Sequence, residues 1–249
     1  AYCRAKGPGW HCMTNAEYAA IALWCKANGY YPRGNNNYGS DHGYPHEKCR
    51  PGTVGSDGRI NLGLTGSGPN SWTHDGTPNG IYGLNGDGWE WAIGLRTNNG
   101  EIQILTGNNA AKNTADLTAG SAEWKAILPD GTLVAPGTAG TLKIDIVSGV
   151  PKISTTVKTT TSSDQWPSTP FKDLAVESGI TIPDILKALA VFPSDNSDHG
   201  GDRFYAKNDG EKCFFRGGYW SNTSDAGVFY LNGNNPRSNS NDNIGFRPA

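Results

Sequence analysis

The sequence lacks long apolar runs and blocks of basic residues. No stretch reaches the roughly eighteen consecutive apolar residues that suggest a membrane-spanning helix, so no membrane insertion is expected. The 21 Lys and Arg and the 23 Asp and Glu leave a formal net charge of -2, and no basic cluster could neutralise a row of phosphates. Nucleic acid is therefore not an expected partner.

Cysteine is scarce and its spacing is uninformative. The count of five is odd, and no two cysteines stand in the CxxC spacing of zinc sites and thioredoxin-like redox sites. We therefore expect reduced thiols rather than a disulfide framework. The cysteines are Cys3, Cys12, Cys25, Cys49 and Cys213.

Turn-forming and aromatic residues are abundant. The chain has 34 Gly and 15 Pro, which favour loops, beside 8 Trp and 10 Tyr, which supply apolar area to a core. This composition predicts a folded, loop-rich protein rather than a disordered one.

Two helices are predicted from capping signals and periodicity. Thr14 and Glu17 form a capping box, apolar residues then recur at helical spacing to Cys25, and Gly29 supplies a left-handed stop. A second, shorter helix is expected at residues 185–191, after Pro183-Asp184 and before Pro193.

Short strands of a mixed sheet are predicted between these helices. Strands are expected at residues 80–84, 89–95 and 100–105, with a tight turn at Asn98-Asn99-Gly100. From residue 108 to 181 the composition shifts to Thr, Ala, Ser, Lys and Gly, with a strand-like stretch at 141–146 and a polar run at 155–164. We interpret residues 108–181 as an inserted β-rich segment in a single domain covering 1–249.

Several motifs resemble a known family in their order. The segments Met13 to Trp24, Pro32 to Asn36 and Gly83 to Trp91 resemble the formylglycine-generating-enzyme branch of the C-type lectin fold. The closing segments Phe215 to Trp220, Ala226 to Phe229 and Asn243 to Arg247 resemble the variable region of proteins diversified by retroelements, such as phage tropism determinants. The resemblance covers residues 10–100 and 190–249. It implies an α+β, C-type-lectin-like fold with a variable ligand-binding region at 216–249.

The resemblance also implies which residues bind ligand. In that family, reverse transcription miscopies adenines of a template repeat, so Asn codons change to Tyr, Ser, Thr, Asp and others without creating a stop. Residues of this kind are interrupted here by scaffold residues such as Trp220 and Phe229. We expect them to face water and to contact ligand, as Tyr, Ser and Asn do in antibody paratopes. The candidate ligand-binding residues are Tyr219, Ser221, Asn222, Thr223, Asp225, Tyr230, Asn232, Asn234 and Asn235. An ordinary polar surface loop is the plain alternative.

Catalytic and metal-binding interpretations are weaker. Formylglycine generation uses a pair of cysteines in the C-terminal part of the family, and here that part holds Cys213 alone. Glu90 lies between two tryptophans that we expect in the core, and the family pattern makes it structural. The set His42, His46, Glu47 and Cys49 has usable spacing for zinc, but its Gly- and Pro-rich context does not place both rings on one helix face. The run of residues 195–200 lacks the closing Glu of a calcium loop and is interpreted as an acidic turn.

The resemblance implies a receptor-binding protein rather than an enzyme, with no cofactor. It would be made in the bacterial cytoplasm and carried at a phage tail tip or fibre. There it would recognise a host surface protein or glycan, in contact with other tail proteins and in a homotrimer. Two alternatives stay open, a diversified bacterial surface adhesin and a formylglycine-generating-type enzyme.

Overall fold

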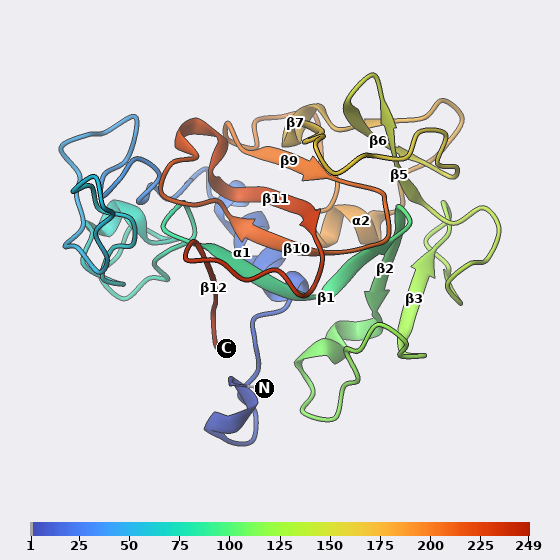
Figure 1. The fold of residues 1–249 in the computed structure, drawn as a ribbon, viewed down its shortest axis with the longest axis horizontal. Helices are drawn as coiled ribbons and strands as arrows, with labels where there is room; N and C mark the ends of the chain where they lie inside the picture. Colours follow the sequence, from blue (N-terminus) through green and yellow to red (C-terminus); the bar gives the residue numbers. More distant parts are fainter. Residues whose placement is uncertain (1) are drawn as a thin grey trace.

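One mixed sheet dominates the structure, a computed structural model that describes residues 2–249 (Figure 1). The strand order is β7-β9-β11-β10-β1-β2-β5-β6-β8, with β12 beside β1, β3 beside β2 and β4 beside β3. Antiparallel pairs predominate, but β12, β9 and β8 each run parallel to a neighbour, so the predicted mixed, loop-rich sheet is confirmed. The strands are β1 (Trp89–Asn98), β2 (Glu101–Leu105), β3 (Trp124–Ile127), β4 (Leu133–Val134), β5 (Lys143–Val147), β6 (Val150–Ser154), β7 (Ser168–Pro170), β8 (Ala175–Val176), β9 (Arg203–Ala206), β10 (Glu211–Gly217), β11 (Gly227–Asn235) and β12 (Ile244–Phe246).

Helix α1 (Asn15–Ala27) forms as the capping signals predict. Thr14 Oγ1 accepts from the Glu17 N–H at 3.1 Å, and Glu17 Oε2 accepts from the Thr14 N–H at 2.9 Å. Gly29 is left-handed, with φ of +63°, and ends the helix region. The helix lies behind the sheet in Figure 1 and packs its buried side chains, Tyr18 among them, against β1 and β11.

Helix α2 (Asp184–Ala188) is shorter than predicted. It was expected to reach residue 191, but Ala190 adopts a left-handed conformation with φ of +44°. The carbonyls of Leu189 and Ala190 then accept from the guanidinium of Arg216 at 3.0 and 3.1 Å. Within residues 2–249, neither α-helix has the length and apolar character that a membrane span requires.

The segment at residues 80–84, predicted as a strand, is irregular. Its backbone pairs with a loop instead, because the Ile81 N–H donates to Nδ1 of His74 at 3.0 Å and the His74 N–H donates to the Ile81 carbonyl at 3.1 Å. Gly83 is left-handed, with φ of +73°, which also breaks an extended run. The strand prediction was wrong because this segment bonds to the loop at His74 instead of pairing with a neighbouring strand.

The predicted insertion, residues 108–181, contributes β3 to β8 and adds strands at both edges of the sheet. The strand expected at 141–146 is β5, and the hairpin turn before β2 has left-handed Asn99 and Gly100 as predicted. Asn208, between β9 and β10, donates to the carbonyls of Ile144 at 3.2 Å and Thr159 at 2.8 Å, which fastens the insertion to the sheet. The assignment of the whole chain to one domain stays a prediction.

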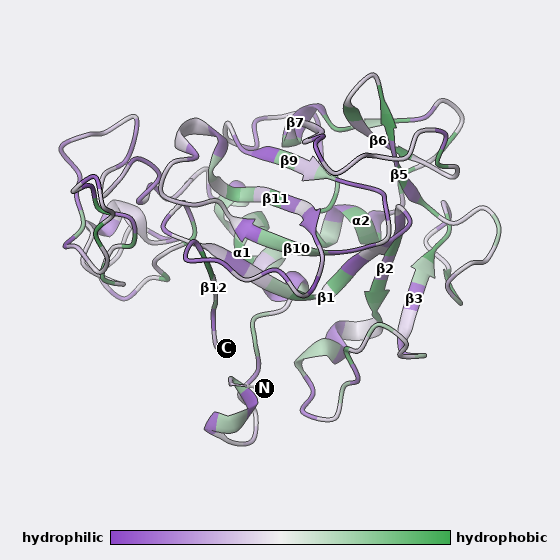
Figure 2. Cartoon of the chain, viewed as in Figure 1, coloured by the Kyte–Doolittle hydropathy of each residue, from purple (hydrophilic) through white to green (hydrophobic). Residues whose placement is uncertain are grey.

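The apolar core lies between the sheet and the two α-helices. Figure 2 shows hydrophobic residues along β2 and β6, whereas the loops drawn at the left are mostly hydrophilic. Short 3-10 helices connect the larger elements: η1 (Arg4–Lys6), η2 (Asn70–Trp72), η3 (Thr106–Ala111), η4 (Phe171–Asp173) and η5 (Thr223–Asp225). The largest fully buried side chains include Tyr18, Phe171, Phe204, Phe214, Phe229 and Arg216.

One carboxyl group lies inside this core. Asp202 is 5% exposed and its Oδ2 accepts from the Phe229 N–H at 2.6 Å. Burial, which penalises the charged form, raises the pKa of Asp202 to about 7. Because the folded pKa lies above the unfolded one, the unfolded chain releases this proton first. The contribution of Asp202 to stability is therefore complete below pH 4 and is lost as the pH rises to 7.

The substitution Asp202→Asn should remove that pH dependence. Asn keeps an oxygen that accepts from Phe229 but cannot ionise, so we expect the variant to gain stability relative to the wild type as the pH rises from 4 to 7. Raising the pKa of Asp202 from 3.8 to about 7 corresponds to roughly 4 kcal/mol, which is the upper limit of this gain in stability. Urea unfolding at pH 5 and pH 8 measures it, and an equal difference between the two proteins at both pH values would contradict the assignment.

Candidate functional site: the C-terminal turn and the outer face of the sheet

The chain turns sharply between β10 and β11, and this 219–225 turn holds five of the predicted ligand-binding residues. Gly217 and Gly218 are both left-handed, with φ of +84°. A Cβ on Gly218 would lie 2.6 Å from the Ala226 Cβ, so only glycine fits there. Asn222 Oδ1 then accepts from the Tyr219 N–H at 2.9 Å, and the Asn222 N–H donates to the Tyr219 carbonyl at 3.0 Å. These reciprocal bonds fix the turn independently of the other side chains in it.

The side chains of the turn reach solvent to different degrees. Thr223 is exposed, and its backbone N–H donates to the Asn36 carbonyl at 2.9 Å. Asp225 accepts from the hydroxyl of Tyr205 at 3.0 Å. The half-buried side chains of the turn are those of Tyr219, Ser221, Asn222 and Asp225. The more distant Asn235 is half-buried as well.

Three of the predicted ligand-binding residues are buried, which corrects the expectation that they face water. Tyr230, Asn232 and Asn234 are 1%, 3% and 4% exposed. They share one side of β11, a strand in the interior of the sheet between β9 and β10. The Tyr230 hydroxyl accepts from Trp89 Nε1 and from Asn232 Nδ2, each at 3.0 Å. Trp89 and mutual hydrogen bonds therefore enclose the polar groups of Tyr230 and Asn232.

Aromatic side chains cover the face of the sheet that points away from α1, which we call the outer face. The rings of Trp89 and Phe215 are parallel with centroids 5.6 Å apart, and Trp91 lies 4.1 Å from Phe215. Tyr219 continues this row, 4.6 Å from Trp89. Both tryptophans were expected in the core, but they are half-exposed. The alternation Trp-Glu-Trp in a strand is the signal for this, because it places both rings on one face and Glu90 on the other.

Two amide side chains near this face have unused hydrogen-bonding capacity. Within the described part of the chain, neither Oδ1 nor Nδ2 of Asn234 has a partner, and Oδ1 of Asn243 has none either. Buried polar atoms are nearly always paired in folded proteins, so these three side-chain atoms are exceptions. The segment after β11 runs from Arg237, which binds Glu211, to Asn243, whose carbonyl accepts from the Trp89 N–H at 2.8 Å.

The residues considered for chemistry have structural partners. Glu90 binds Arg247 through two contacts of 3.0 and 3.1 Å. Burial raises the pKa of Cys213 to about 11, so its thiol is protonated at neutral pH and is a poor nucleophile. All five cysteines are free, as predicted.

The carboxylate of the segment considered for zinc already binds other side chains of the protein. Glu47 accepts from Arg33 at 2.6 and 2.9 Å and from Ser71 and Trp72. In residues 2–249, no three His, Cys, Asp or Glu side chains gather as a metal site would require. At the acidic turn, Asp195 Oδ1 accepts from the Ser197 N–H at 2.8 Å.

The chain matches no protein-family model and no curated protein sequence. The site consists of a rigid turn with half-exposed polar and aromatic side chains, beside an aromatic sheet face. Such an arrangement suits non-covalent binding, because aromatic rings bury large area at low entropic cost and the polar groups adapt their hydrogen bonds.

Proposed function

We propose that this protein is a retroelement-diversified receptor-binding protein that recognises a bacterial surface protein or glycan, with the 219–225 turn as its contact surface. Within the predicted site, the 219–225 turn and Asn235 are where side chains reach solvent. One observation carries the proposal. Apart from Trp220, the side chains of the turn reach solvent, and its backbone is fixed by two glycines and the Asn222 bonds, so the residues other than Trp220 and Asn222 can change without changing the loop.

The buried row, which is Tyr230, Asn232 and Asn234, is proposed to support the contact surface and not to touch ligand. These side chains support the outer face, and Trp89 links Tyr230 to Tyr219 through a hydrogen bond on one side and ring packing on the other. A change in this row would therefore act on ligand through the aromatic residues above it. The direct contacts are assigned to Tyr219, Ser221, Asn222, Thr223 and Asp225, with Asn235 at the far end of β11.

The proposed setting is a phage tail tip or fibre, with the protein contacting other tail proteins as a homotrimer. Many copies on one particle would multiply modest single-site affinities. A surface adhesin would use the same face. A secretion or lipoprotein leader encoded by the full gene would favour the adhesin, whereas neighbouring tail genes would favour the phage.

Binding is proposed rather than catalysis. A formylglycine-type enzyme would need a second thiol in reach of Cys213, and the other four cysteines lie at or before residue 49 in the chain. Cys3 and Cys12 line the same cleft as Cys213, but burial raises the pKa of the Cys12 thiol to about 12 and that of Cys213 to about 11. Protonated thiols do not supply the nucleophile that such chemistry starts from.

The DNA beside the gene tests the proposal. We expect a near-copy of the codons for residues 216–249 that differs at adenines and lies next to a reverse transcriptase gene. The codons for Tyr219, Ser221, Thr223 and Asp225 should be among the differing positions, whereas Asn222, whose side chain fixes the turn, should be kept. A locus without such a repeat would overturn the diversification part of the proposal.

Binding to cells tests the contact surface itself. A variant that combines Tyr219→Ser, Ser221→Tyr, Thr223→Asn and Asp225→Asn keeps Asn222, which the turn needs, and Asn suits the left-handed conformation of residue 223. Fluorescently labelled protein should bind cells of the bacterium whose genome or phage carries the gene. The variant should bind at least tenfold more weakly, the loss expected when aromatic contacts are removed. Lys187→Gln, at an ion pair with Asp184 on α2, serves as the control, and equal binding by all three proteins would contradict the assignment.

A further inference from the structure

A cleft of about 590 Å³ opens beside the outer face, where the N-terminal segment, β1 and the loop of residues 115–118 meet. Trp91, whose ring packs on Phe215, forms part of its wall, so the cleft adjoins the aromatic row. Most of its lining is apolar, including Ile93, Leu95, Leu117, Trp124 and Phe246. A concave, mostly apolar site of this volume is typical of pockets for small molecules.

The backbone of β1 builds this cleft. Ala92 lies opposite Phe214 in β10, but the next pair is Arg96 with Cys213, so residues 93–95 form a bulge without partners in that ladder. Gly94 within the bulge is left-handed, with φ of +84°, and a Cβ there would lie 2.7 Å from the Ala110 Cβ. The bulge in β1 and the left-handed Gly94 therefore determine the shape of the cleft.

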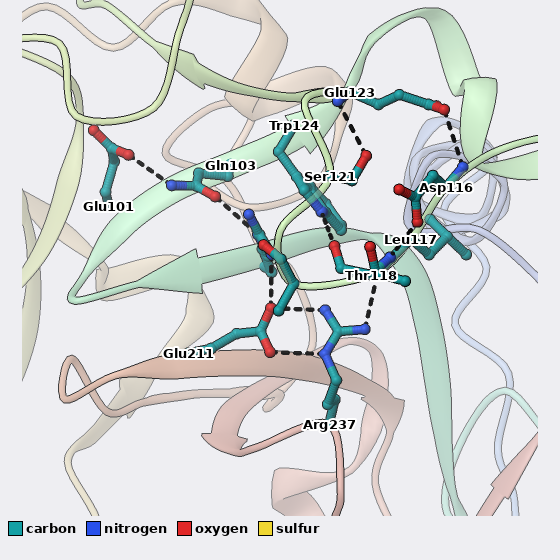
Figure 3. A network of polar contacts seen from close by, with 12 residues as sticks. Glu101, Gln103, Asp116, Leu117, Thr118, Ser121, Glu123, Trp124, Glu211 and Arg237 are labelled. Atoms are coloured by element: carbon teal, nitrogen blue, oxygen red, sulfur yellow. Dashed lines mark hydrogen bonds and ion pairs between the residues drawn. The ribbon is translucent and has the colours of Figure 1, made fainter.

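Charge at the rim of the cleft is unbalanced. Its charged lining residues are Arg4, Arg237 and Asp116, two cations and one anion. Arg237 is held by Glu211, which also binds Arg96 at 2.7 Å, as Figure 3 shows for Glu211 and Arg237. Arg4 donates to the carbonyls of Lys112 at 2.9 Å and Ala115 at 3.3 Å, and within residues 2–249 it has no carboxylate partner. Arg4 is thus a positioned guanidinium whose charge is not neutralised.

Two of the thiols that line the cleft, those of Cys12 and Cys213, add no opposing charge. Burial raises the pKa of Cys12 to about 12 and that of Cys213 to about 11, so both are neutral at physiological pH. Neutral thiols behave as small polarisable apolar groups. An anion at the rim therefore meets a positive Arg4 and an uncharged interior.

We propose that this cleft binds a small amphipathic anion, with a flat apolar body between Trp91 and Trp124 and one acidic group at Arg4. An apolar body matches the lining, and a single negative charge matches the surplus cation. A guanidinium–anion hydrogen bond at a partly desolvated site gives both affinity and orientation. The site is separate from the 219–225 turn and does not depend on the proposed receptor-binding function.

Two fluorescent probes of similar size test the proposal. The anionic probe is 8-anilinonaphthalene-1-sulfonate, and the neutral probe is N-phenyl-1-naphthylamine, which lacks the sulfonate. We expect saturable binding of the anionic probe to the native protein, whose fold is checked by near-ultraviolet circular dichroism. Arg4→Gln should weaken anionic binding about tenfold, as loss of one hydrogen bond to a charged group does. It should leave neutral binding within about twofold.

A second variant locates the site. Cys213→Phe places a ring in the cleft and should weaken both probes, whereas the exposed control Arg59→Gln should change neither. Absence of saturable binding, or binding that Cys213→Phe leaves unchanged in a folded protein, would overturn the cleft as a ligand site. Equal effects of Arg4→Gln on the two probes would overturn the acidic group as part of the ligand.

Discussion

Replacing Arg216 with Met should lower the free energy of unfolding by about 3–5 kcal/mol, because each buried acceptor left without a donor costs about 1–3 kcal/mol. The Arg216 side chain is fully buried and donates to Asn15 Oδ1 at 2.7 and 3.0 Å. It also donates to the carbonyls of Leu189 and Ala190. Met fills similar volume but leaves these three acceptors without the donor that joins α1, α2 and β10. Urea unfolding measures the loss.

Arg216→Lys is the matched control for charge. Burial lowers the pKa of Arg216 to about 10, so the guanidinium remains protonated at neutral pH. Lys keeps a charge but not the planar fork that reaches Asn15 and both carbonyls together, so a smaller but clear loss is expected. If both variants unfold within about 1 kcal/mol of the wild type, the guanidinium does not join these elements.

Trp220→Ala should cost about 3–5 kcal/mol, the range for truncating a buried aromatic side chain. Trp220 is 7% exposed, and its backbone N–H donates to the Asp87 carbonyl at 3.1 Å. Its ring meets that of Tyr219 edge to face at 5.3 Å. Because Trp220 supports Tyr219 from beneath, receptor binding should weaken together with stability.

Trp166→Ala provides the comparison, since Trp166 is 61% exposed and lies under Lys207 in a cation–π contact. That variant should lose less than about 1 kcal/mol. Denaturant midpoints of the two alanine variants measure the difference. Similar midpoints would mean that Trp220 is not part of the scaffold.

Local signals in the sequence predicted the local elements well. The Thr14 and Glu17 capping box, the stop at Gly29 and the Asn-Asn-Gly turn each depend on neighbouring residues, and each forms as expected. The end of α2 did not follow from local signals, because the carbonyls that end it bind Arg216, distant in the sequence. The strand predicted at 80–84 failed for the same reason, since its partner is a loop that the sequence does not identify.

The larger error was to predict that Tyr230, Asn232 and Asn234 of β11 face water, because all three are buried. Asn232 and Asn234 are polar, and polarity suggested exposure, yet both faces of β11 are covered. The uninterrupted apolar run from Val228 to Leu231 was the available signal, because a strand buried on both faces reads this way. The enclosing partners, Trp89 above all, come from a strand more than a hundred residues earlier, which a single sequence does not connect to Tyr230.

The most direct test of the account compares the stability of two multiple variants. One carries the four substitutions of the 219–225 turn, and the other replaces Tyr230, Asn232 and Asn234 with Ser. We expect the turn variant to unfold within about 1 kcal/mol of the wild type and the second variant to lose at least about 3 kcal/mol. A turn variant that is destabilised as much as the buried-row variant would contradict a stiff frame carrying interchangeable side chains.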